Sequence, residues 1–352
     1  MHIEYHQESG GFSALEPEWN RLLEKSHTNT LFLTWHWQST WWKHLGGGDL
    51  LLVGLRLEGD GRLVAIAPLF SPTGLPFRAL SLVGCREVSD YLDVLVERGQ
   101  EEPSYRALLD FLAADVVPAW DVIDLCNVPE ASPTLARLPE LARARGYQVR
   151  VELEDVCPVL ELPLTWDEYL DTLDKKQRHE IRRKLRRAQQ EADTRYVVVG
   201  AGHDLEAEVR AFIALHQKSS PDKNRFMDPR MQAFFVDAAR VLYRCGWLQL
   251  AFVEMDGQKA AGLFNFDYGD AILVYNSGYD PEQFSSLSPG IIVTAHTIEQ
   301  AIALGRQKLD FLQGPEIYKY RFGASDTRVY RLLLARPEID LDQAWAAGQA
   351  TS

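Results

Sequence analysis

Apolar residues of this chain fall into short runs of strand length, separated by polar turns that contain glycine. Two pairs of runs are spaced like β-hairpins: 50–57 with 63–70 around Asp60-Gly61, and 247–254 with 259–266 around Asp256-Gly257. An Asp-Gly step between strand-like runs favours a hairpin, because glycine readily adopts the backbone conformation of a tight turn. The pattern therefore predicts one such hairpin in each half of the chain.

A strand, a loop and a helix are predicted after the second hairpin. Residues 271–275 form a strand-like run, and a polar loop then ends in Ser288-Pro289-Gly290. Apolar residues follow at helical spacing: Ile291, Ile292, Ala295, Ile298, Ala301 and Ile302. Gly305 ends this predicted helix, 308–312 is a second strand, and 316–323 is a basic and aromatic turn. A loop that leads into a helix start favours anion binding, because the first backbone N–H groups are free.

The first half has the same order of elements, with a hairpin, a further strand, a helix and a strand. A chain of 352 residues is also long for one hydrophobic core. Together these features predict two copies of one α/β unit. The predicted segments are an N-terminal domain at 1–160, basic connecting helices at 161–192, a C-terminal domain at 193–336 and a tail at 337–352.

Composition and charge narrow the class of protein. The chain is 46% hydrophobic and 25% charged, which is typical of a soluble globular protein, and its apolar runs are too short to cross a membrane. The net charge of -13 argues against a DNA-binding protein. The first residues lack the pattern of a secretory signal. Four widely separated cysteines, Cys85, Cys126, Cys157 and Cys245, predict reduced thiols, no metal site and a cytoplasmic location.

Three local features have both a structural and a functional interpretation. The stretch from Lys175 to Arg187 holds eight Lys or Arg with helical periodicity and one acid, so it is either a solvated face or the lining of an anion-binding groove. The predicted helix 35–45, capped by Thr34, carries four tryptophans, which indicate core packing or, at Trp35, substrate stacking. His216, on the predicted helix 204–220, is either structural or a proton shuttle.

Several stretches of the second half resemble one protein family. They are Tyr275-Asn-Ser-Gly-Tyr-Asp, Ser288-Pro-Gly, Asp310-Phe-Leu-x-Gly and Tyr318-Lys319-x-Arg321-Phe-Gly. In these motifs the chain resembles the CelD/BcsL-type acetyltransferases, which are GNAT-like proteins related to the FemAB peptidyltransferases. The resemblance implies an α/β (α+β) fold of tandem GNAT-like domains. Each domain would be a mixed, largely antiparallel sheet flanked by helices, with the active cleft between the two domains.

The resemblance also implies a donor site in the second domain. In GNAT enzymes the pyrophosphate of acyl-CoA lies on the loop before a helix, which corresponds here to 284–290. The expected donor-binding residues are Ser288, Pro289, Gly290, Tyr275, Lys319 and Arg321. The loop keeps only Gly290 and a few hydroxyls of the usual Gln/Arg-x-x-Gly-x-Gly/Ala pattern. Aminoacyl-tRNA, the donor of FemAB enzymes, is therefore the alternative donor, and plain surface charge is the alternative role for the two basic residues.

Acyl transfer to an amine needs a group that takes the proton of the amine and a group that protonates the leaving thiolate. The candidate catalytic residues are Asp310, Asp90, Tyr91, His216 and Tyr318. The candidate substrate-binding residues are Arg178, Arg182, Trp35, Phe226, Gly314 and Glu316. The Asp90-Tyr91 pair and the Arg178-x-x-x-Arg182 helix are chosen by their likeness to the family. Asp310 is alternatively a structural partner of a backbone turn.

The expected function is acyl transfer, with acetyl as the expected acyl group, from acyl-CoA to an amine or hydroxyl of a sugar or envelope-polysaccharide precursor. No metal is required. The motifs of other enzyme classes are absent: Gly-x-Ser-x-Gly, His-Glu-x-x-His, Gly-x-x-x-x-Gly-Lys-Ser/Thr and Gly-x-Gly-x-x-Gly. One rival is an aminoacyl-tRNA-dependent transferase, although the chain lacks a second long charged helical arm. The other is a non-catalytic accessory protein of a polysaccharide synthase.

Overall fold

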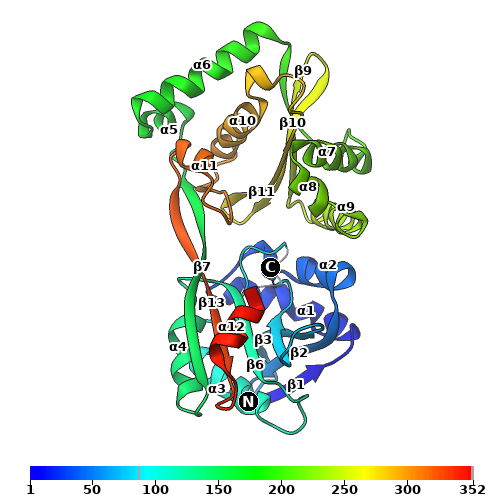
Figure 1. Cartoon of the computed structure of the whole chain (residues 1–352), viewed down its shortest axis with the longest axis vertical. Helices are drawn as coiled ribbons and strands as arrows, with labels where there is room; N and C mark the ends of the chain where they lie inside the picture. The colour runs from blue at the N-terminus through cyan, green and yellow to red at the C-terminus, as the bar shows by residue number, and fades with distance from the viewer. Residues whose placement is uncertain (86–87, 350–352) are drawn as a thin grey trace. The chain divides into compact units, whose positions relative to one another are not determined.

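The computed structural model describes residues 1–85 and 88–349 and divides into two compact units (Figure 1). Unit 1 comprises Met1–Asp155 and Arg328–Ser352, and unit 2 comprises Val156–Thr327. The end of the chain therefore groups with the first unit, whereas the sequence suggested consecutive segments. Two strands, β7 (Gln148–Glu161) and β13 (Ser325–Ala335), each begin in one unit and end in the other.

Unit 1 is a mixed sheet with helices. Its strands and helices are β1 (His2–His6), α1 (Gly10–Lys25), η1 (Leu31–Leu33), α2 (Trp35–Leu45), β2 (Gly48–Arg56), β3 (Leu63–Pro72), β4 (Ala79–Leu82), β5 (Leu95–Val96), α3 (Glu101–Leu112), β6 (Val122–Pro129), α4 (Pro133–Arg143) and α12 (Leu341–Gln349), with parts of β7 and β13. The strand order is β1-β2-β3-β4-β6-β13, and β4 and β6 are parallel.

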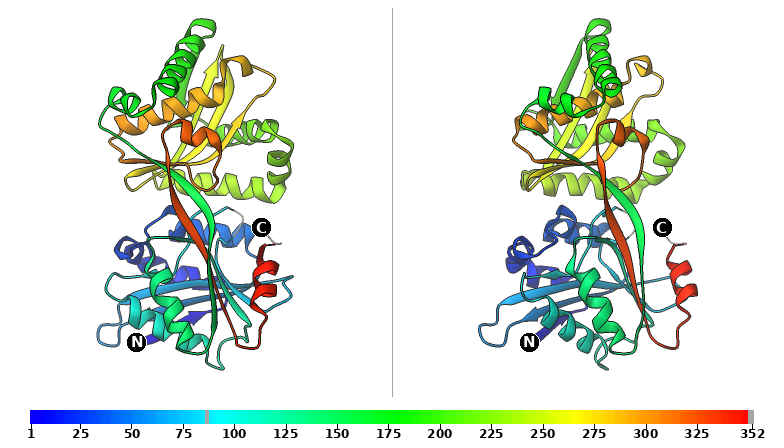
Figure 2. Two further views of the ribbon diagram at one scale, coloured as in Figure 1. Left: turned by 60° about the vertical axis from the view of Figure 1, so that its left-hand side comes forward. Right: turned by 90° about the vertical axis from the view of Figure 1, so that its left-hand side faces the viewer.

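Unit 2 repeats this plan. Its elements are α5 (Trp166–Thr172), α6 (Lys175–Glu191), β8 (Thr194–Val198), α7 (Leu205–Ser219), α8 (Pro221–Phe226), α9 (Pro229–Arg244), β9 (Leu248–Met255), β10 (Gln258–Tyr268), β11 (Ala271–Tyr279), η2 (Ser285–Leu287), α10 (Pro289–Ala303), β12 (Lys308–Asp310) and α11 (Ile317–Arg321). The strand order β8-β9-β10-β11-β12-β7 matches that of unit 1, with β11 and β12 parallel. Figure 2 shows α10 on one face of this sheet and α7 to α9 on the other.

The two predicted hairpins are confirmed, as β2–β3 and β9–β10, both antiparallel. In each unit the hairpin is followed by an antiparallel third strand, a crossover helix and a parallel fourth strand. The predicted architecture of two α/β units with mixed and largely antiparallel sheets is likewise confirmed. A parallel pair needs a crossover connection of a dozen or more residues, and α10 supplies it in unit 2.

Local sequence accounts for several helix boundaries. Helix α2 begins at Trp35 because the Thr34 hydroxyl accepts a hydrogen bond from the Trp37 N–H at 3.2 Å, as the predicted cap requires. Helix α7 begins in the same way after Asp204, whose carboxylate accepts hydrogen bonds from the next free N–H groups. The apolar stripe of α10 packs into the core of unit 2, where Ile292 and Ile298 have no exposed surface.

Two predicted elements differ in extent or type. The strand expected at 147–153 is β7, which continues to Glu161, because its second half pairs with β12 through Leu160 and Leu309. The turn expected at 316–323 contains the short helix α11. Its local sequence, rich in aromatic and basic residues, gave no apolar period long enough to predict a helix.

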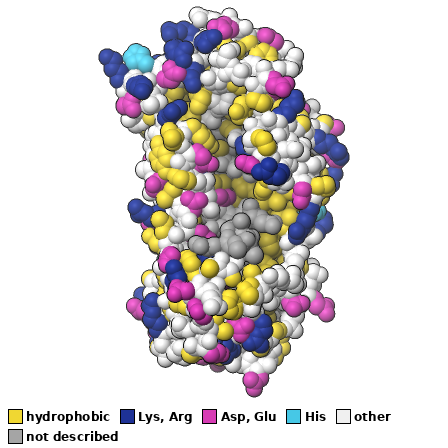
Figure 3. Space-filling view, viewed as in Figure 1, with side chains coloured by type: hydrophobic (Ala, Val, Ile, Leu, Met, Phe, Trp, Pro, Cys, Tyr) yellow, Lys and Arg dark blue, Asp and Glu magenta, His cyan; other side chains and the backbone are white. Residues whose placement is uncertain are grey.

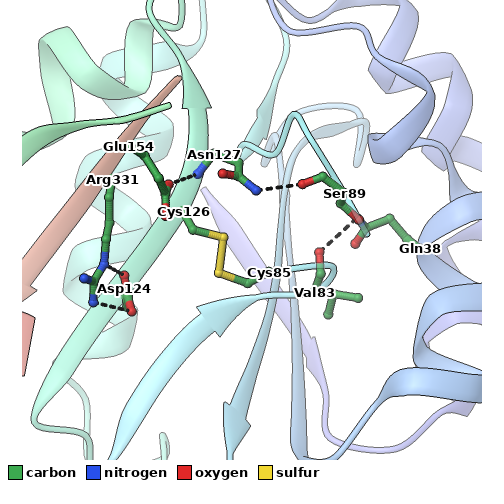
Figure 4. Close-up of a disulfide and its surroundings, with 9 residues drawn as sticks. All are labelled: Gln38, Val83, Cys85, Ser89, Asp124, Cys126, Asn127, Glu154 and Arg331. Carbon is green, nitrogen blue, oxygen red and sulfur yellow. Dashed lines mark hydrogen bonds and ion pairs between the residues drawn. A yellow bond between two sulfur atoms is a disulfide. The ribbon is translucent and has the colours of Figure 1, made fainter. Parts of the chain in front are cut away.

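The prediction of four reduced thiols is wrong, because a disulfide joins Cys85 to Cys126 (Figure 4). Its two Cα atoms are 5.9 Å apart, while Cys157 and Cys245 are free. Backbone and side-chain hydrogen bonds surround it: Asn127 donates from its amide to the Ser89 carbonyl at 2.7 Å. The sequence could not show this pair, because strand β6 brings Cys126 to a residue 41 positions earlier.

No helix within residues 1–85 and 88–349 is both long enough and apolar enough to cross a membrane.

Candidate active site

The end of β11 is fastened to the last turn of α7. His216 Nε2 and Asn276 Oδ1 are 3.1 Å apart, and the Ser219 hydroxyl accepts a hydrogen bond from the Tyr279 N–H at 2.9 Å. Gly278 permits this close approach, because a Cβ at that position would lie 2.5 Å from the His216 backbone nitrogen. These contacts fix the position of β11 where it passes the end of its neighbour β12.

Strands β11 and β12 pair over only three residues, from Ala271 with Lys308 to Leu273 with Asp310. Beyond this point β11 continues along β10 alone, and a register shift leaves Tyr275 as an extra residue between two pairs. Such a bulge bends a strand and often re-aims side chains next to a functional site. The Tyr275 ring itself packs among phenylalanines, with its centroid 4.9 Å from that of Phe266.

Lys319 organises the loop that follows β12. Its ammonium group donates hydrogen bonds to the carbonyl oxygens of Leu312 at 3.1 Å, Gln313 at 2.7 Å and Gly314 at 2.9 Å, and lies 2.8 Å from the Glu316 carboxylate. Leu312 and Gly314 both have positive φ, so this loop adopts a conformation that needs such fixing. Plain surface charge, the alternative role considered for Lys319, is excluded, because the residue is only 2% exposed.

Glu316, Lys319, Lys223 and Tyr318 form what we call the polar cluster. Glu316 is its exposed carboxylate, with 58% of the side chain accessible. It also influences two other half-buried groups. Burial lowers the pKa of Lys223, and the nearby Glu316 opposes that change. Burial raises the pKa of Tyr318 above its usual range, and the same carboxylate raises it further. Lys223 additionally donates to the Ser277 hydroxyl on β11 at 3.1 Å. The cluster therefore combines a carboxylate, two ammonium groups and a phenol that remains protonated at neutral pH.

His216 is a buried neutral side chain. Burial, together with the neighbouring charge of Lys223, lowers the pKa of His216 to about 4. Its ring packs against Phe226, with the two centroids 5.8 Å apart, and only 1% of the residue is exposed. His216 and Phe226, both expected near the chemistry, thus lie together in the packing between α7 and α8. Asp310 is also nearly buried and accepts a hydrogen bond from the Leu312 N–H at 2.7 Å.

Asp280, the first residue after β11, makes several of the contacts that hold the loop from β11 to α10. Asp280 accepts hydrogen bonds from the N–H groups of Glu282 and Gln283 and pairs with the Lys218 ammonium at 3.0 Å. Burial alone would raise the pKa of Asp280, but these donors lower it overall. Ser288, which precedes α10, has φ of 59° and makes no side-chain capping bond. Gly290, in the first turn of α10, has no atom within 4 Å of an added Cβ.

A basic pocket of about 570 Å³ lies against the beginning of α10. We call it the α6 pocket, and it is lined by Lys176, Gln177, His179, Glu180, Ile181, Arg183, Lys184, Arg186, Ile291, Arg321 and Phe322. Lys and Arg side chains gather over this region in Figure 3. Arg321 is therefore at a concave basic site, as expected for a residue that binds donor charge. Arg178 and Arg182, chosen from the same helix, are not among the lining residues.

The other predicted site residues belong to unit 1. Trp35 donates from its indole N–H to the Phe12 carbonyl at 2.8 Å, which ties α2 to α1. Tyr91 is 7% exposed and its ring lies 6.3 Å from that of Phe32, while Asp90 is half-buried beside it. These surroundings are those of packing residues within unit 1. Among the described residues, no group of three or more His, Cys, Asp or Glu side chains could hold a metal ion.

Sequence reasoning missed Lys223 and the pocket residues Lys176 and Arg186. A signal for Lys223 was present in Ser220-Pro221-Asp222, which marks a helix start directly after α7 and places Lys223 in its first turn. For the pocket, helical spacing puts Lys176, Arg183 and Arg186 on one stripe. The pattern could not show that this stripe, rather than the one with Arg178, faces α10 and α11.

Comparison with known proteins assigns the class. Residues 175–320 match the family described as an acetyltransferase (GNAT) domain. The matched segment begins with α6, includes the polar cluster and covers less than half of the chain, and the match identifies the protein as an acyltransferase. The match does not distinguish the CelD/BcsL type from other members. Of the curated proteins compared, none matches the chain.

Solved structures share the fold over almost the whole chain. FemX is 13% identical with a TM-score of 0.65, covering 94% of this chain and 97% of its own. L-PGS from Bacillus licheniformis is 11% identical with a TM-score of 0.57, covering 94% and 95%. The C-terminal domain of a protein assigned as a lysylphosphatidylglycerol synthetase from Agrobacterium fabrum is 10% identical with a TM-score of 0.56, covering 98% and 96%. At these identities the likeness concerns the fold alone.

Proposed function

We propose that this protein transfers an acyl group, in particular acetyl, from acyl-CoA to an amine or hydroxyl of a sugar or envelope-polysaccharide precursor. The observation that supports acyl-CoA as the donor is the match of 175–320 to the GNAT domain family. In this segment a loop leads from β11 into the start of α10. The first turn of a helix offers free N–H groups and a partial positive charge to the phosphates of a donor. The acceptor class rests on the motif resemblance to the CelD/BcsL-type proteins.

In this proposal the polar cluster performs the proton transfers. Glu316 is its accessible carboxylate and would receive the proton of the attacking amine or hydroxyl. Tyr318 stays protonated at neutral pH, because burial and Glu316 both raise its pKa, so its phenol can donate to the leaving thiolate. Lys319 would act as a positioning residue that holds the 312–314 loop, and Lys223 would hold Ser277 on β11.

The test is acetyl-CoA cleavage, followed as release of free thiol, in the presence of hexosamines, hexoses and no acceptor. The proposal expects acceptor-dependent release with an amino or hydroxyl sugar, and a loss of at least tenfold in kcat/KM for Glu316→Gln, which corresponds to about 1.4 kcal/mol. Tyr318→Phe should lower kcat more than it raises KM. Well-folded protein that releases no thiol with any acceptor would contradict the proposal.

A second candidate function is acyl transfer from aminoacyl-tRNA to such an acceptor. The α6 pocket favours it, since five cations line a surface of an otherwise acidic chain and RNA backbones are bound through such charges. Transfer of a labelled amino acid from charged tRNA, with no activity on acetyl-CoA, would establish this alternative. A non-catalytic accessory role would be indicated only if neither donor is consumed by folded protein.

A further inference from the structure

The α6 pocket concentrates positive charge within a negatively charged protein. Its lining includes the five cations Lys176, Arg183, Lys184, Arg186 and Arg321 and one carboxylate, Glu180, so its formal charge is 5 − 1 = +4 with His179 neutral. The whole chain carries -13. A concave patch of opposite sign within such a chain focuses anions, because nearby low-dielectric walls direct the field into it.

The cations of α6 divide into paired and unpaired groups. Arg178 forms an ion pair with Asp171 at 2.6 Å, and Arg182 lies 3.9 Å from Asp167, so these two arginines outside the pocket have carboxylate partners. Glu180 lies against Arg183 at 2.8 Å and Lys184 at 3.6 Å. Lys176, Arg186 and Arg321 form no hydrogen bond or ion pair with any residue in the described parts of the chain. Three of the unneutralised charges therefore line the pocket, whereas Lys175, at the start of α6, lies outside it.

The base of the α6 pocket is apolar. Ile181 and Phe322 are 4% and 1% exposed, and Ile291 adds a side chain from the first turn of α10. The volume of about 570 Å³ lies within the range of small-molecule sites and exceeds the needs of a single phosphate ion. An apolar base with a rim of cations fits a ligand that carries a flat ring system and several phosphate charges.

We propose that the α6 pocket binds a phosphorylated adenosine, the chemical group that the 3′-phospho-ADP of CoA and the 3′ end of tRNA share. This inference rests on the proposed function, because it assigns the pocket to the nucleotide end of the acyl donor. Helix α11 connects the two sites: Arg321 at its end lines the pocket, whereas Lys319 holds the 312–314 loop of the polar cluster. A donor bound by its nucleotide at α6 would direct its acyl group along α11 toward that cluster.

The experiment measures the Kd of 3′,5′-ADP, of CoA and of a short RNA hairpin ending in CCA, by calorimetry at low ionic strength. The pocket variant is Lys176→Gln with Arg186→Gln. The matched control is Arg178→Gln with Arg182→Gln, which removes the same charge from the same helix outside the pocket. We expect the pocket variant to weaken binding at least tenfold and the control less than twofold. Arg321→Gln, on a different helix, should weaken it about fivefold.

Equal weakening in the pocket variant and the control would overturn the proposal, because it would show only a general electrostatic effect. Unchanged binding in the pocket variant, with an unchanged melting temperature, would also overturn it. The two Kd values also identify the donor. Tighter binding of CoA than of the RNA hairpin indicates acyl-CoA, and tighter binding of the hairpin indicates aminoacyl-tRNA. If binding depends on the pocket but no acyl group is transferred, the proposed function is refuted and nucleotide binding in the α6 pocket stands. If the pocket variant releases thiol with an unchanged KM for acetyl-CoA, nucleotide binding in the α6 pocket is refuted and the proposed function stands.

Discussion

Units 1 and 2 have the same strand order, but they differ in the segment that follows β4 in unit 1 and β11 in unit 2. In unit 1 two described residues of this segment are held by side-chain bonds: Cys85 is bonded to Cys126 on β6, and the Trp37 indole donates to the Ser89 hydroxyl at 2.9 Å. In unit 2 the equivalent loop is held at Asp280 and runs into α10, next to accessible charged groups. One topology thus serves as a packed unit and as a unit with polar groups available for chemistry.

The two units also differ in the surroundings of their buried charged side chains. In unit 1 Asp93 accepts hydrogen bonds from the hydroxyls of Thr28, Ser132 and Thr134 and from the Val94 N–H, and burial raises its pKa. In unit 2 one of the buried charges is the Lys319 ammonium, which contacts a carboxylate that remains 58% exposed. A carboxylate enclosed by hydroxyls stabilises a fold, whereas an exposed carboxylate beside buried cations can exchange a proton with a ligand. The following predictions test this contrast.

The largest expected effect is the loss of the disulfide of unit 1. Cys126→Ser should lower the free energy of unfolding by about 4 kcal/mol, because the bond closes a loop between residues 41 apart and restricts the unfolded chain. Urea unfolding with and without reductant measures it, and Cys245→Ser is the control with a small effect. Four titratable thiols in the native protein, with no effect of reductant, would contradict the prediction and remove one difference between the units.

Replacing Lys319 should cost about 3 kcal/mol, because three carbonyl groups of the 312–314 loop lose their donor in a buried position. Lys319→Met is the suitable variant, since it preserves most of the buried volume. The control is Arg321→Gln, an exposed residue on the same helix, which should change stability by less than about 0.5 kcal/mol. If both variants unfold at the same urea concentration as the parent, the role of Lys319 in fixing the loop is refuted.

The buried His216 predicts a pH dependence of stability. Its pKa is about 4 in the native protein, below its ordinary value of 6.5, so the unfolded chain binds this proton more readily. Its contribution is present above pH 6.5 and is lost as the pH falls toward 4, by up to about 3 kcal/mol. His216→Gln should flatten the stability profile over this range in urea unfolding at several pH values. Parallel profiles for the two proteins would show that His216 is not buried in its neutral form.

The smallest effect comes from a pair of glycines in unit 2. Gly278→Ala should cost about 2 kcal/mol, because the new Cβ would lie 2.5 Å from the backbone nitrogen of His216 and push α7 away from β11. Gly290→Ala should change stability by less than about 0.5 kcal/mol, since no atom lies within 4 Å of its Cβ position. Thermal melting compares the two. Similar melting temperatures would mean that β11 and α7 are not in the close contact described.

The sequence predicted the elements whose signals are local. Both Asp-Gly hairpins, the Thr34-capped helix and the helix that starts at Pro289 follow from patterns within about 15 residues, and the repeated order of elements revealed the tandem fold. The extension of β7 was not predictable, because it depends on pairing with β12 and β13 from much later in the chain.

The site was predictable in part. The motifs at 275–323 include Lys319 and Tyr318 of the polar cluster, and Arg321 lines the α6 pocket. Surface charge was the alternative role considered for Lys319, because a basic residue in a polar stretch is usually exposed, and only the fold brings three carbonyl groups to its ammonium. Arg178 and Arg182 were preferred over Arg186 although both have carboxylate partners on α5. Sequence periodicity reports which residues share a face, but it does not report which face has free charge.

In the proposed function, unit 2 alone binds the acyl donor. Hydrogen exchange of the full-length protein, with and without saturating CoA, tests it directly, because bound ligand slows exchange in the segments it stabilises. We expect protection at 281–292, at 175–187 and at 312–323, with no change at the corresponding segments of unit 1, 88–100 and 122–134. Protection confined to those unit 1 segments, or none at a CoA concentration shown to be saturating, would contradict the account.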